Sequence, residues 1–211
     1  MATKEKDFTK EYFQRTWGKE GYYEKFNYGV GIDTVCAISL EPFFSITKHA
    51  LEIGCGGGVF TERMVDNFGY LTAIDVIELP KQFLKFHNFS YIEQSDQATG
   101  CEGIENNSID FCFCYNLFCH LSNEMLTEYL KSVFRVLKRG GDFVFMIANF
   151  EHSKIHVPDS DKYKLGDLFS FGHFYQDDRT LDIIADQTNW QIINRNMIPE
   201  HRDILIHLKK R

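Results

Sequence analysis

An acidic residue followed by alternating glycines is the part of the chain best suited to bind a ligand. A short apolar run ends in Glu52 and leads into Gly54, Gly56 and Gly58. Glycine allows sharp bends and lets a ligand lie directly against the main chain. The apolar spacing of residues 59–65 predicts a helix, whose first N–H groups are free to meet a polar ligand. The stretch therefore predicts a strand, a turn and a helix beside a ligand, with a purely structural turn as the alternative.

The spacing of the glycines argues against two common nucleotide sites. A dinucleotide turn of the form G-x-G-x-x-G needs a small residue at position 59, where this chain has Val59. A P-loop needs a lysine followed by serine or threonine after the glycines, and this stretch has none.

A second acid is expected at the same edge of the fold. Residues 70–75 predict a strand that ends in Asp75, 21 positions after Gly54. An acid at this point lies beside the glycine turn and can accept hydrogen bonds from both hydroxyls of a ribose.

Strand and helix patterns alternate along the chain, which favours a mostly parallel sheet. Ser122 is the expected N-cap of the clearest amphipathic helix, and Arg139-Gly140-Gly141 its expected end. Pro42 predicts a break in the first helix, or two short helices in its place. The expected helices are 33–48, 58–68, 79–87, 123–138 and 180–188, and the expected strands are 49–54, 70–75, 90–94, 110–116, 142–148, 190–197 and 203–209.

These motifs, in this order, resemble the class I S-adenosylmethionine-dependent methyltransferases of the small-molecule type. The resemblance covers about residues 48–150 and includes acid-x-Gly-x-Gly-x-Gly, the acids after the second and third strands, and Ser-Ile-Asp-Phe before the fourth. Arg-Val-Leu-Lys-Arg-Gly-Gly precedes the fifth, with Arg139 where the family usually has proline. The resemblance implies an α/β, Rossmann-like, doubly wound fold: a mostly parallel seven-stranded sheet with helices on both faces and an antiparallel C-terminal strand.

The resemblance also implies S-adenosyl-L-methionine as the cofactor and S-adenosyl-L-homocysteine as its product. Glu52 would anchor the ammonium group, Asp75 the ribose and Asp96 the adenine amino group. For Asn116, a turn without ligand contact is an equal alternative. The full set of expected cofactor residues is Glu52, Gly54, Cys55, Gly56, Gly58, Asp75, Val76, Asp96, Gln97 and Asn116.

The acceptor region is expected at two aromatic segments of a single domain that spans residues 1–211. Residues 1–32 suit an N-terminal cap over the ligand cleft, or else cover one side of the core. Residues 150–178 interrupt the alternation, and loops of this length are often functional. In this second segment His173 and Tyr175 are the expected acceptor contacts, with an ordinary surface loop as the alternative.

His120 is the candidate general base, with a packing or capping histidine as the alternative. It follows the fourth strand at the edge where parallel strands end and ligands bind. A neutral imidazole can take the proton of a hydroxyl group as the new bond forms. If His120 is structural, the base lies among His173, Tyr175 and Asp177, or the acceptor is an amine.

Composition limits the partners. A formal net charge of −7 over 211 residues argues against general binding to nucleic acid. No apolar run approaches ~18 residues, so no membrane span is expected. The polar start lacks a signal-peptide core, and with it the six cysteines predict reduced thiols in a cytoplasmic protein. A monomer or homodimer is expected. Alternation along a strand explains Cys112 and Cys114 without a metal.

The expected function is O-methylation of a small hydroxylated acceptor, such as a sugar or nucleotide sugar of a surface polysaccharide or secondary metabolite pathway. Two alternatives stay open. One is N-methylation of a small amine, and the other is a methyltransferase-like protein that binds the cofactor without catalysis.

Overall fold

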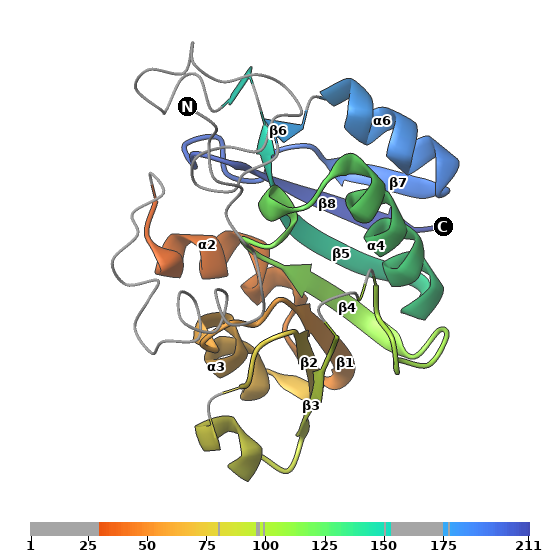
Figure 1. The fold of residues 1–211 in the computed structure, drawn as a ribbon. Coiled ribbons are helices and arrows are strands. Elements are labelled where there is room, and N and C mark those ends of the chain that lie inside the picture. Colours follow the sequence, from red (N-terminus) through yellow and green to blue (C-terminus); the bar gives the residue numbers. More distant parts are fainter. Residues whose placement is uncertain are drawn as a thin grey trace, which may run out of the picture.

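Seven strands form a sheet in the order β3-β2-β1-β4-β5-β8-β7 (Figure 1). The computed structural model describes residues 30–79, 81–95, 98, 100–149, 151–152, 175–176 and 178–211. The expected cap at 1–32 and insertion at 150–178 lie mostly outside these residues. The strands are β1 Ser45–Ile53, β2 Phe68–Asp75, β3 Phe89–Glu93, β4 Ile109–Cys114, β5 Leu137–Asn149, β7 Trp190–Asn194 and β8 Ile204–Lys210, while β6 Tyr175–Gln176 pairs with β5 off this path.

Strand direction confirms the expected fold class. Strands β1 to β5 pair in parallel, and β8 runs antiparallel to both of its neighbours, β5 and β7. Because the chain passes from β1 outward to β3 and then returns to β4, the two halves of the sheet wind in opposite directions. This is the doubly wound arrangement, closed by an antiparallel C-terminal strand.

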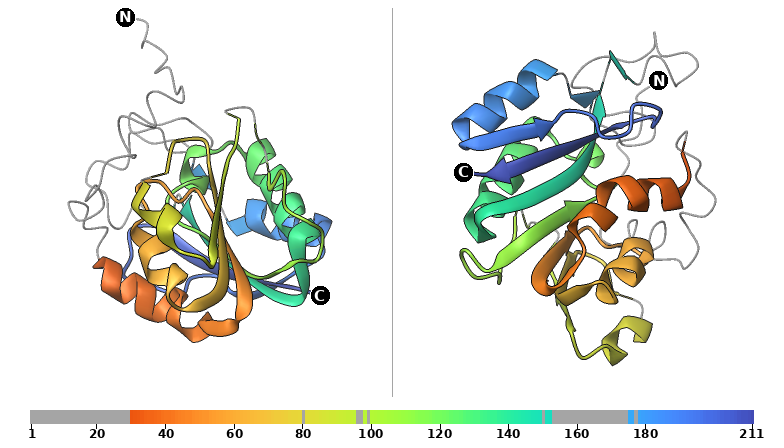
Figure 2. Two further views of the ribbon diagram at one scale, coloured as in Figure 1. Left: turned by 90° about the horizontal axis from the view of Figure 1, so that it is seen from below. Right: turned by 180° about the vertical axis from the view of Figure 1, so that it is seen from behind.

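Helices cover both faces of the sheet (Figures 1 and 2). One face is covered by α4 Asn123–Val136 and α6 Asp178–Gln187, and the other by α2 Ile32–Ser39 and α3 Val59–Val65. Short 3₁₀ helices complete the second face, at η2 Glu41–Phe43 and η3 Lys81–Lys85, and a further one, η4 Phe118–His120, follows β4. The predicted N-cap is confirmed, since Ser122 Oγ accepts from Met125 N at 3.3 Å.

Alternating side chains on β4 show how the core divides. Phe111 and Phe113 join the cluster under α2 and α3, whereas Cys112 and Cys114 join the cluster under α4. All four side chains are at most 1% exposed. A strand covered by helices on both faces must be apolar on both, which explains its continuous apolar sequence.

The break expected near Pro42 is confirmed, but the helix predicted at 33–48 extends too far. The helix predicted at 33–48 ends at Ser39, and Pro42 lies in η2 near its start, where a proline N–H is not needed. Strand β1 then begins at Ser45, which pairs with Phe68 of β2. The segment 45–48 is therefore strand, because its backbone hydrogen-bonding groups find a partner strand.

The glycines after α4 do not end that helix. The helix ends at Val136, and Arg139 to Gly141 belong to β5. A Cβ on Gly141 would lie 2.9 Å from Lys138 O and 3.2 Å from Asp110 O. Gly141 is thus required where β5 approaches β4 closely.

The helix predicted at 79–87 is only the 3₁₀ helix η3. Phe83 is buried and Phe86 packs against the same cluster, whereas Leu84 is 64% exposed. A spacing of three residues between inward side chains matches the three residues per turn of a 3₁₀ helix.

Candidate functional site

The carboxyl ends of β1, β2, β4 and β5 lie along one edge of the sheet, because these strands are parallel. The winding reverses between β1 and β4, and ligands of doubly wound folds bind outside such a reversal. The glycine turn follows β1 at this point, and Asn116 follows β4.

All three motif glycines have positive φ: 73° at Gly54, 52° at Gly56 and 90° at Gly58. This region is strained for residues with a Cβ. Gly58 is the N-cap of α3, and a Cβ there would lie 2.2 Å from Cε2 of Phe83. A Cβ on Gly54 would lie 3.0 Å from Leu117, which comes from the turn after β4. The motif therefore makes a bare, tightly packed backbone surface.

Asp75 joins the end of β2 to this turn. Its Oδ2 accepts from Gly56 N at 2.7 Å, and its Oδ1 accepts from Val76 N at 2.7 Å and Ile77 N at 3.2 Å. Burial raises the pKa of this carboxyl, and the three N–H donors oppose that shift. Asp75 is thus held at the turn, as its expected role requires.

Glu52 lies inside the protein at the end of β1, with 3% of its surface exposed. Its Oε2 accepts from Thr61 Oγ1 at 2.6 Å. Burial raises the pKa of Glu52 to about 8, while the bond from Thr61 lowers it and the nearby Asp75 raises it further. Burial thus disfavours the ionised form of Glu52, and a cation placed beside it would favour that form.

Asn116 and Cys55 take mainly structural positions. Asn116 has a φ of 58°, a conformation that asparagine tolerates, and its Oδ1 accepts from Cys119 Sγ at 3.5 Å. Cys55 is 4% exposed, and burial raises the pKa of its thiol. Both residues flank the reversal between β1 and β4.

His120 ends η4, five residues after Tyr115 and on the same edge as the glycine turn. Its backbone N–H donates to Leu117 O at 2.8 Å, and Leu117 is the residue that packs on Gly54. The short helix thus places His120 in the segment that borders the turn.

Three expected site residues lie outside the described residues: Asp96, Gln97 and His173. The same holds for Asp177. Tyr175 is described only as part of β6, beside the end of β5. Val76 follows Asp75 and is partly buried.

Sequence reasoning missed a buried polar group at the same edge. Tyr115 Oη lies 2.7 Å from His201 Nε2, and His201 Nδ1 lies 2.8 Å from Asp203 O and 3.0 Å from Asp203 N. His152 Nε2 reaches His201 O at 2.5 Å. Nothing in the local pattern signals this group, since Tyr115 and His201 are 86 residues apart. Thr61, the partner of Glu52, was missed as well, although it lies in the first turn of the predicted helix.

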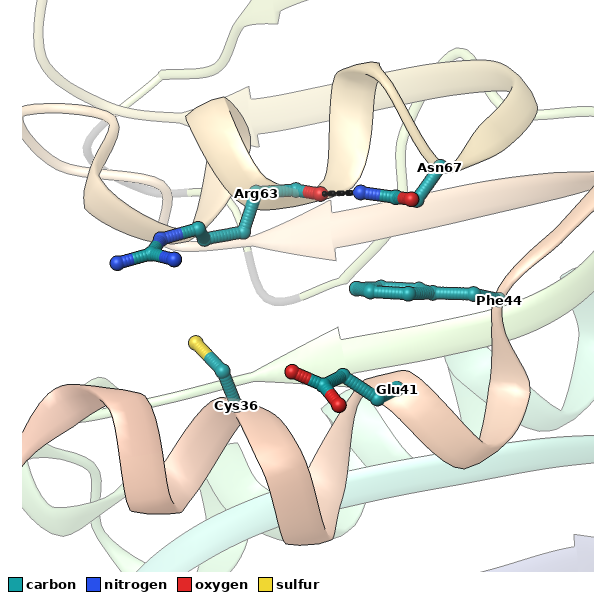
Figure 3. Close-up of a pocket in the computed structure, with 5 residues that line it drawn as sticks. All are labelled: Cys36, Glu41, Phe44, Arg63 and Asn67. Carbon is teal, nitrogen blue, oxygen red and sulfur yellow. Dashed lines mark hydrogen bonds between the residues drawn. The ribbon is translucent and has the colours of Figure 1, made fainter.

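A cavity of about 480 Å³ lies elsewhere, between α2 and α3 (Figure 3). It is lined by Cys36, Glu41, Phe44, Arg63 and Asn67, and the Asn67 amide donates to Arg63 O. Phe44 precedes β1 and Asn67 precedes β2, so this cavity lies toward the amino ends of the strands. It is therefore separate from the edge that holds the glycine turn.

Within the described residues no helix is long and apolar enough to cross a membrane. The same part of the chain contains no group of three or more histidine, cysteine or acidic residues placed to hold a metal ion.

Comparisons with known proteins agree with this geometry. Residues 51–145 match the model of the family described as "Methyltransferase domain". The ubiquinone biosynthesis O-methyltransferase of Pseudomonas fluorescens is 28% identical over 108 residues, which are 48% of this chain and 45% of that protein. The phosphoethanolamine N-methyltransferase of Triticum aestivum is 30% identical over 120 residues, 55% of this chain and 24% of that protein. The aligned part is thus less than half of either relative.

The fold is also found in solved structures. The N-methyltransferase NodS of Bradyrhizobium japonicum, crystallised with S-adenosyl-L-homocysteine, superposes with a TM-score of 0.67. The two chains are 16% identical, and the superposition covers 95% of this chain and 97% of NodS. At this identity the likeness concerns the fold. The family match thus identifies a methyltransferase domain over residues 51–145, which are less than half of the chain, and the order of the motifs and the shared fold agree with it.

Proposed function

We propose that the chain transfers the methyl group of S-adenosylmethionine to a hydroxyl group of a small molecule, such as a sugar or nucleotide sugar. The observation that best supports cofactor binding is the arrangement around Gly56, where a bare turn lies between the buried Glu52 and the partly buried Asp75. Glu52 would receive the ammonium group of the cofactor, and Asp75 its ribose hydroxyls. Val76 and Asn116, with Asp96 and Gln97, are proposed to complete the cofactor contacts.

The residues fit this cofactor because a Cβ is absent where a ligand must approach the backbone. Bound S-adenosylmethionine supplies an electrophilic methyl group. The protein must align the acceptor with the S–CH₃ bond and remove the acceptor's proton. We assign proton removal to His120, in the segment that borders the glycine turn. The acceptor would lie toward β5 and residues 150–178, where His173 and Tyr175 are proposed contacts.

An amine acceptor is the second candidate. It is favoured by the 30% identity to a phosphoethanolamine N-methyltransferase. An uncharged amine attacks without a strong base, so His120 would then be less important for turnover.

Binding and product mass test the proposal. Calorimetry should show a site of ~micromolar affinity for S-adenosyl-L-homocysteine, about −8 kcal/mol, and none for a nicotinamide dinucleotide. A panel of UDP-glucose, glucose, catechol and phosphoethanolamine, corrected for cofactor hydrolysis, should give a mass gain of one methyl group on a hydroxyl compound. Methylation of phosphoethanolamine alone would favour the amine. Cofactor binding with every acceptor inert would favour a non-catalytic protein.

The proposed setting is a cytoplasmic monomer or homodimer. All six cysteines are free and buried, which is consistent with a reducing compartment.

A further inference from the structure

A glutamine of β6, beside the end of β5, is buried, and its side chain has no hydrogen-bond partner among the described residues. Gln176 belongs to β6, which lies beside β5 (Figure 1). The two strands pair in parallel, with Gln176 opposite Asn149. Only 1% of its surface is exposed. Neither Nε2 nor Oε1 has a hydrogen-bond partner among the described residues.

A buried amide in this state destabilises the ligand-free protein. Removing an amide from water without new hydrogen bonds is unfavourable, and nearly all buried polar groups in folded proteins are paired. The nearest paired amide follows this rule, because Asn149 Oδ1 accepts from His152 N at 2.9 Å. An exception at a ligand-binding edge indicates that the missing partner comes from the ligand.

The position of Gln176 indicates which ligand this is. The ribose acid Asp75 ends β2, and β1 and β4 lie between β2 and β5. Three strand spacings of about 4.8 Å place the end of β5 roughly 14 Å from Asp75. A ribose bound at Asp75 is therefore too far away to bond with Gln176. The acceptor, which must reach the methyl group from the other side, is the ligand on the β5 side of the edge.

The chemistry of the amide selects the kind of acceptor. Gln176 offers two donors at Nε2 and an acceptor at Oε1, and all are unused. A carboxylate or phosphate has only acceptors and would leave Oε1 unpaired. An ammonium group has only donors and would leave Nε2 unpaired. A group that both donates and accepts can satisfy the two ends of the amide, and a hydroxyl group, which the proposed function gives the acceptor, is of this kind.

We propose that Gln176 is a specificity-determining residue of the acceptor site, where its amide recognises an uncharged hydroxyl-bearing group. This inference rests on the proposed function, and it refines the acceptor to one with a hydroxyl close to the methylated atom. Gln176 is not required for cofactor binding or for proton removal. Its contribution is to orient the acceptor at the end of β5.

Gln176→Met tests the inference, because methionine has a similar length and no hydrogen-bonding amide. Gln191→Met is the matched control, since Gln191 is an exposed strand glutamine on β7. Calorimetry on protein loaded with S-adenosyl-L-homocysteine would measure the affinity for UDP-glucose, glucose, catechol and phosphoethanolamine. Thermal denaturation of the ligand-free variants would measure stability.

We expect the substitution to affect stability and acceptor affinity in opposite directions. Gln176→Met should denature at the same or a higher temperature than the wild type, because an unpaired buried amide has been removed. Its affinity for the hydroxyl compound that binds the wild type should fall by about tenfold or more. The affinity for S-adenosyl-L-homocysteine should stay within twofold. Gln191→Met should leave all of these values unchanged.

Several outcomes would overturn the inference. They are a lower denaturation temperature with unchanged probe affinity, a loss confined to phosphoethanolamine, and a wild-type complex that binds no hydroxyl compound. Because binding is measured without turnover, a hydroxyl compound that needs Gln176 to bind but is never methylated would contradict the proposed function and leave this inference standing.

Discussion

The backbone N–H of Gly56 donates to Oδ2 of Asp75 at 2.7 Å. This bond joins the turn after β1 to the end of β2, so the two motifs form one unit before any ligand binds. The other carboxylate oxygen accepts from Val76 and Ile77. Asp75 is thereby oriented in advance, which reduces the conformational entropy lost on binding a ribose.

Replacing Asp75 with alanine should weaken the affinity for S-adenosyl-L-homocysteine by about 1.5–3 kcal/mol, the range for hydrogen bonds to a charged group. Circular dichroism should show an intact fold, because Asp75 ends its strand and is not part of the core. Asp66→Ala is the control, since Asp66 is an exposed acid just after α3. Equal affinities in the Asp75 and Asp66 variants would remove Asp75 from the cofactor site.

Replacing Gly58 with alanine should destabilise the protein for two reasons. Its φ of 90° is unfavourable for a residue with a Cβ, by about 1–2 kcal/mol. The new Cβ would also lie 2.2 Å from the Phe83 ring, which adds about 1–3 kcal/mol of overpacking. Urea denaturation measures the sum.

Gly140→Ala separates the two effects. Gly140 has a φ of 78°, but a Cβ there meets nothing within 4 Å. The control should therefore lose only the conformational part, about 1–2 kcal/mol. Adding Phe83→Leu to Gly58→Ala should recover part of the difference. Equal losses at positions 58 and 140 would contradict the contact with Phe83.

The sequence predicted what is local and periodic. It placed the glycine turn, Asp75 and the Ser122 N-cap, because each depends on residues a few positions apart. It missed the start of β1 at Ser45 and the start of β5 at Leu137. Both extensions depend on pairing with another strand, at Phe68 and Ile109 respectively. Such pairing is a tertiary effect that local propensity does not contain.

The polar groups at the β5 end were missed for the same reason. The contact between His201 and Tyr115 depends on the pairing of β8 with β5. The burial of Gln176 depends on the pairing of β6 with β5. In sequence each resembles an ordinary loop or strand residue. Thr61 could have been predicted from the sequence. It is a polar residue in the first turn of α3, only nine residues after Glu52, to which it donates a hydrogen bond.

Glu52 predicts how stability depends on pH. Its pKa is raised from 4.5 to about 8 in the folded protein, chiefly by burial. Between these values the folded state holds a proton that the unfolded state releases. The free energy of unfolding of the ligand-free protein should therefore fall as pH rises from about 4.5 to 8, by up to roughly 5 kcal/mol. Asp75, whose pKa is also raised by burial, contributes with the same sign.

Glu52→Gln should remove most of this fall, because glutamine keeps the bond to Thr61 and carries no titratable proton. Urea denaturation at pH 5, 6.5 and 8 would measure it. Glu62→Gln is the control, as Glu62 is an exposed residue of α3. A wild-type stability that is flat or rising over this range would contradict the raised pKa.

The same carboxyl predicts proton release on cofactor binding. An ammonium group beside Glu52 favours the ionised form, so binding at pH 7 should release up to about one proton. Calorimetry with S-adenosyl-L-homocysteine in phosphate and Tris buffers detects this as a difference in apparent enthalpy. Affinity should rise with pH up to about 8. Glu52→Gln should bind more weakly and show no buffer dependence, and a buffer-dependent variant would assign the proton elsewhere.

The Tyr115–His201 pair should make the protein sensitive to acid. Burial lowers the pKa of His201, with Arg202 and His152 lowering it further and Asp203 opposing them. The unfolded state therefore binds a proton before the folded state does. Neutral His201 makes its full contribution to the free energy of unfolding above about pH 6.5, the pKa of an unfolded histidine. This contribution is lost as pH falls through the lower pKa that His201 has in the folded protein.

A double-mutant cycle of Tyr115→Phe and His201→Ala should give a coupling of about 0.5–1.5 kcal/mol at pH 7.5. His201→Ala alone should cost more than Tyr115→Phe, because it leaves the tyrosine hydroxyl buried without its partner and opens a cavity. His87→Ala is the control, since His87 is exposed. Additive single losses would mean that the 2.7 Å contact contributes nothing.

His120 is the residue whose replacement should affect turnover most and binding least. If it takes the acceptor's proton, His120→Ala should reduce turnover by about 10²–10⁴. Affinity for S-adenosyl-L-homocysteine should change by less than a few-fold, because the assigned cofactor contacts lie on Glu52, the glycine turn and Asp75. His87→Ala again serves as the control. Near-normal turnover of the His120 variant, measured where chemistry limits the rate, would show that His120 only packs η4. The base would then be sought among His173, Tyr175 and Asp177, or the acceptor would be an amine that attacks in its uncharged form.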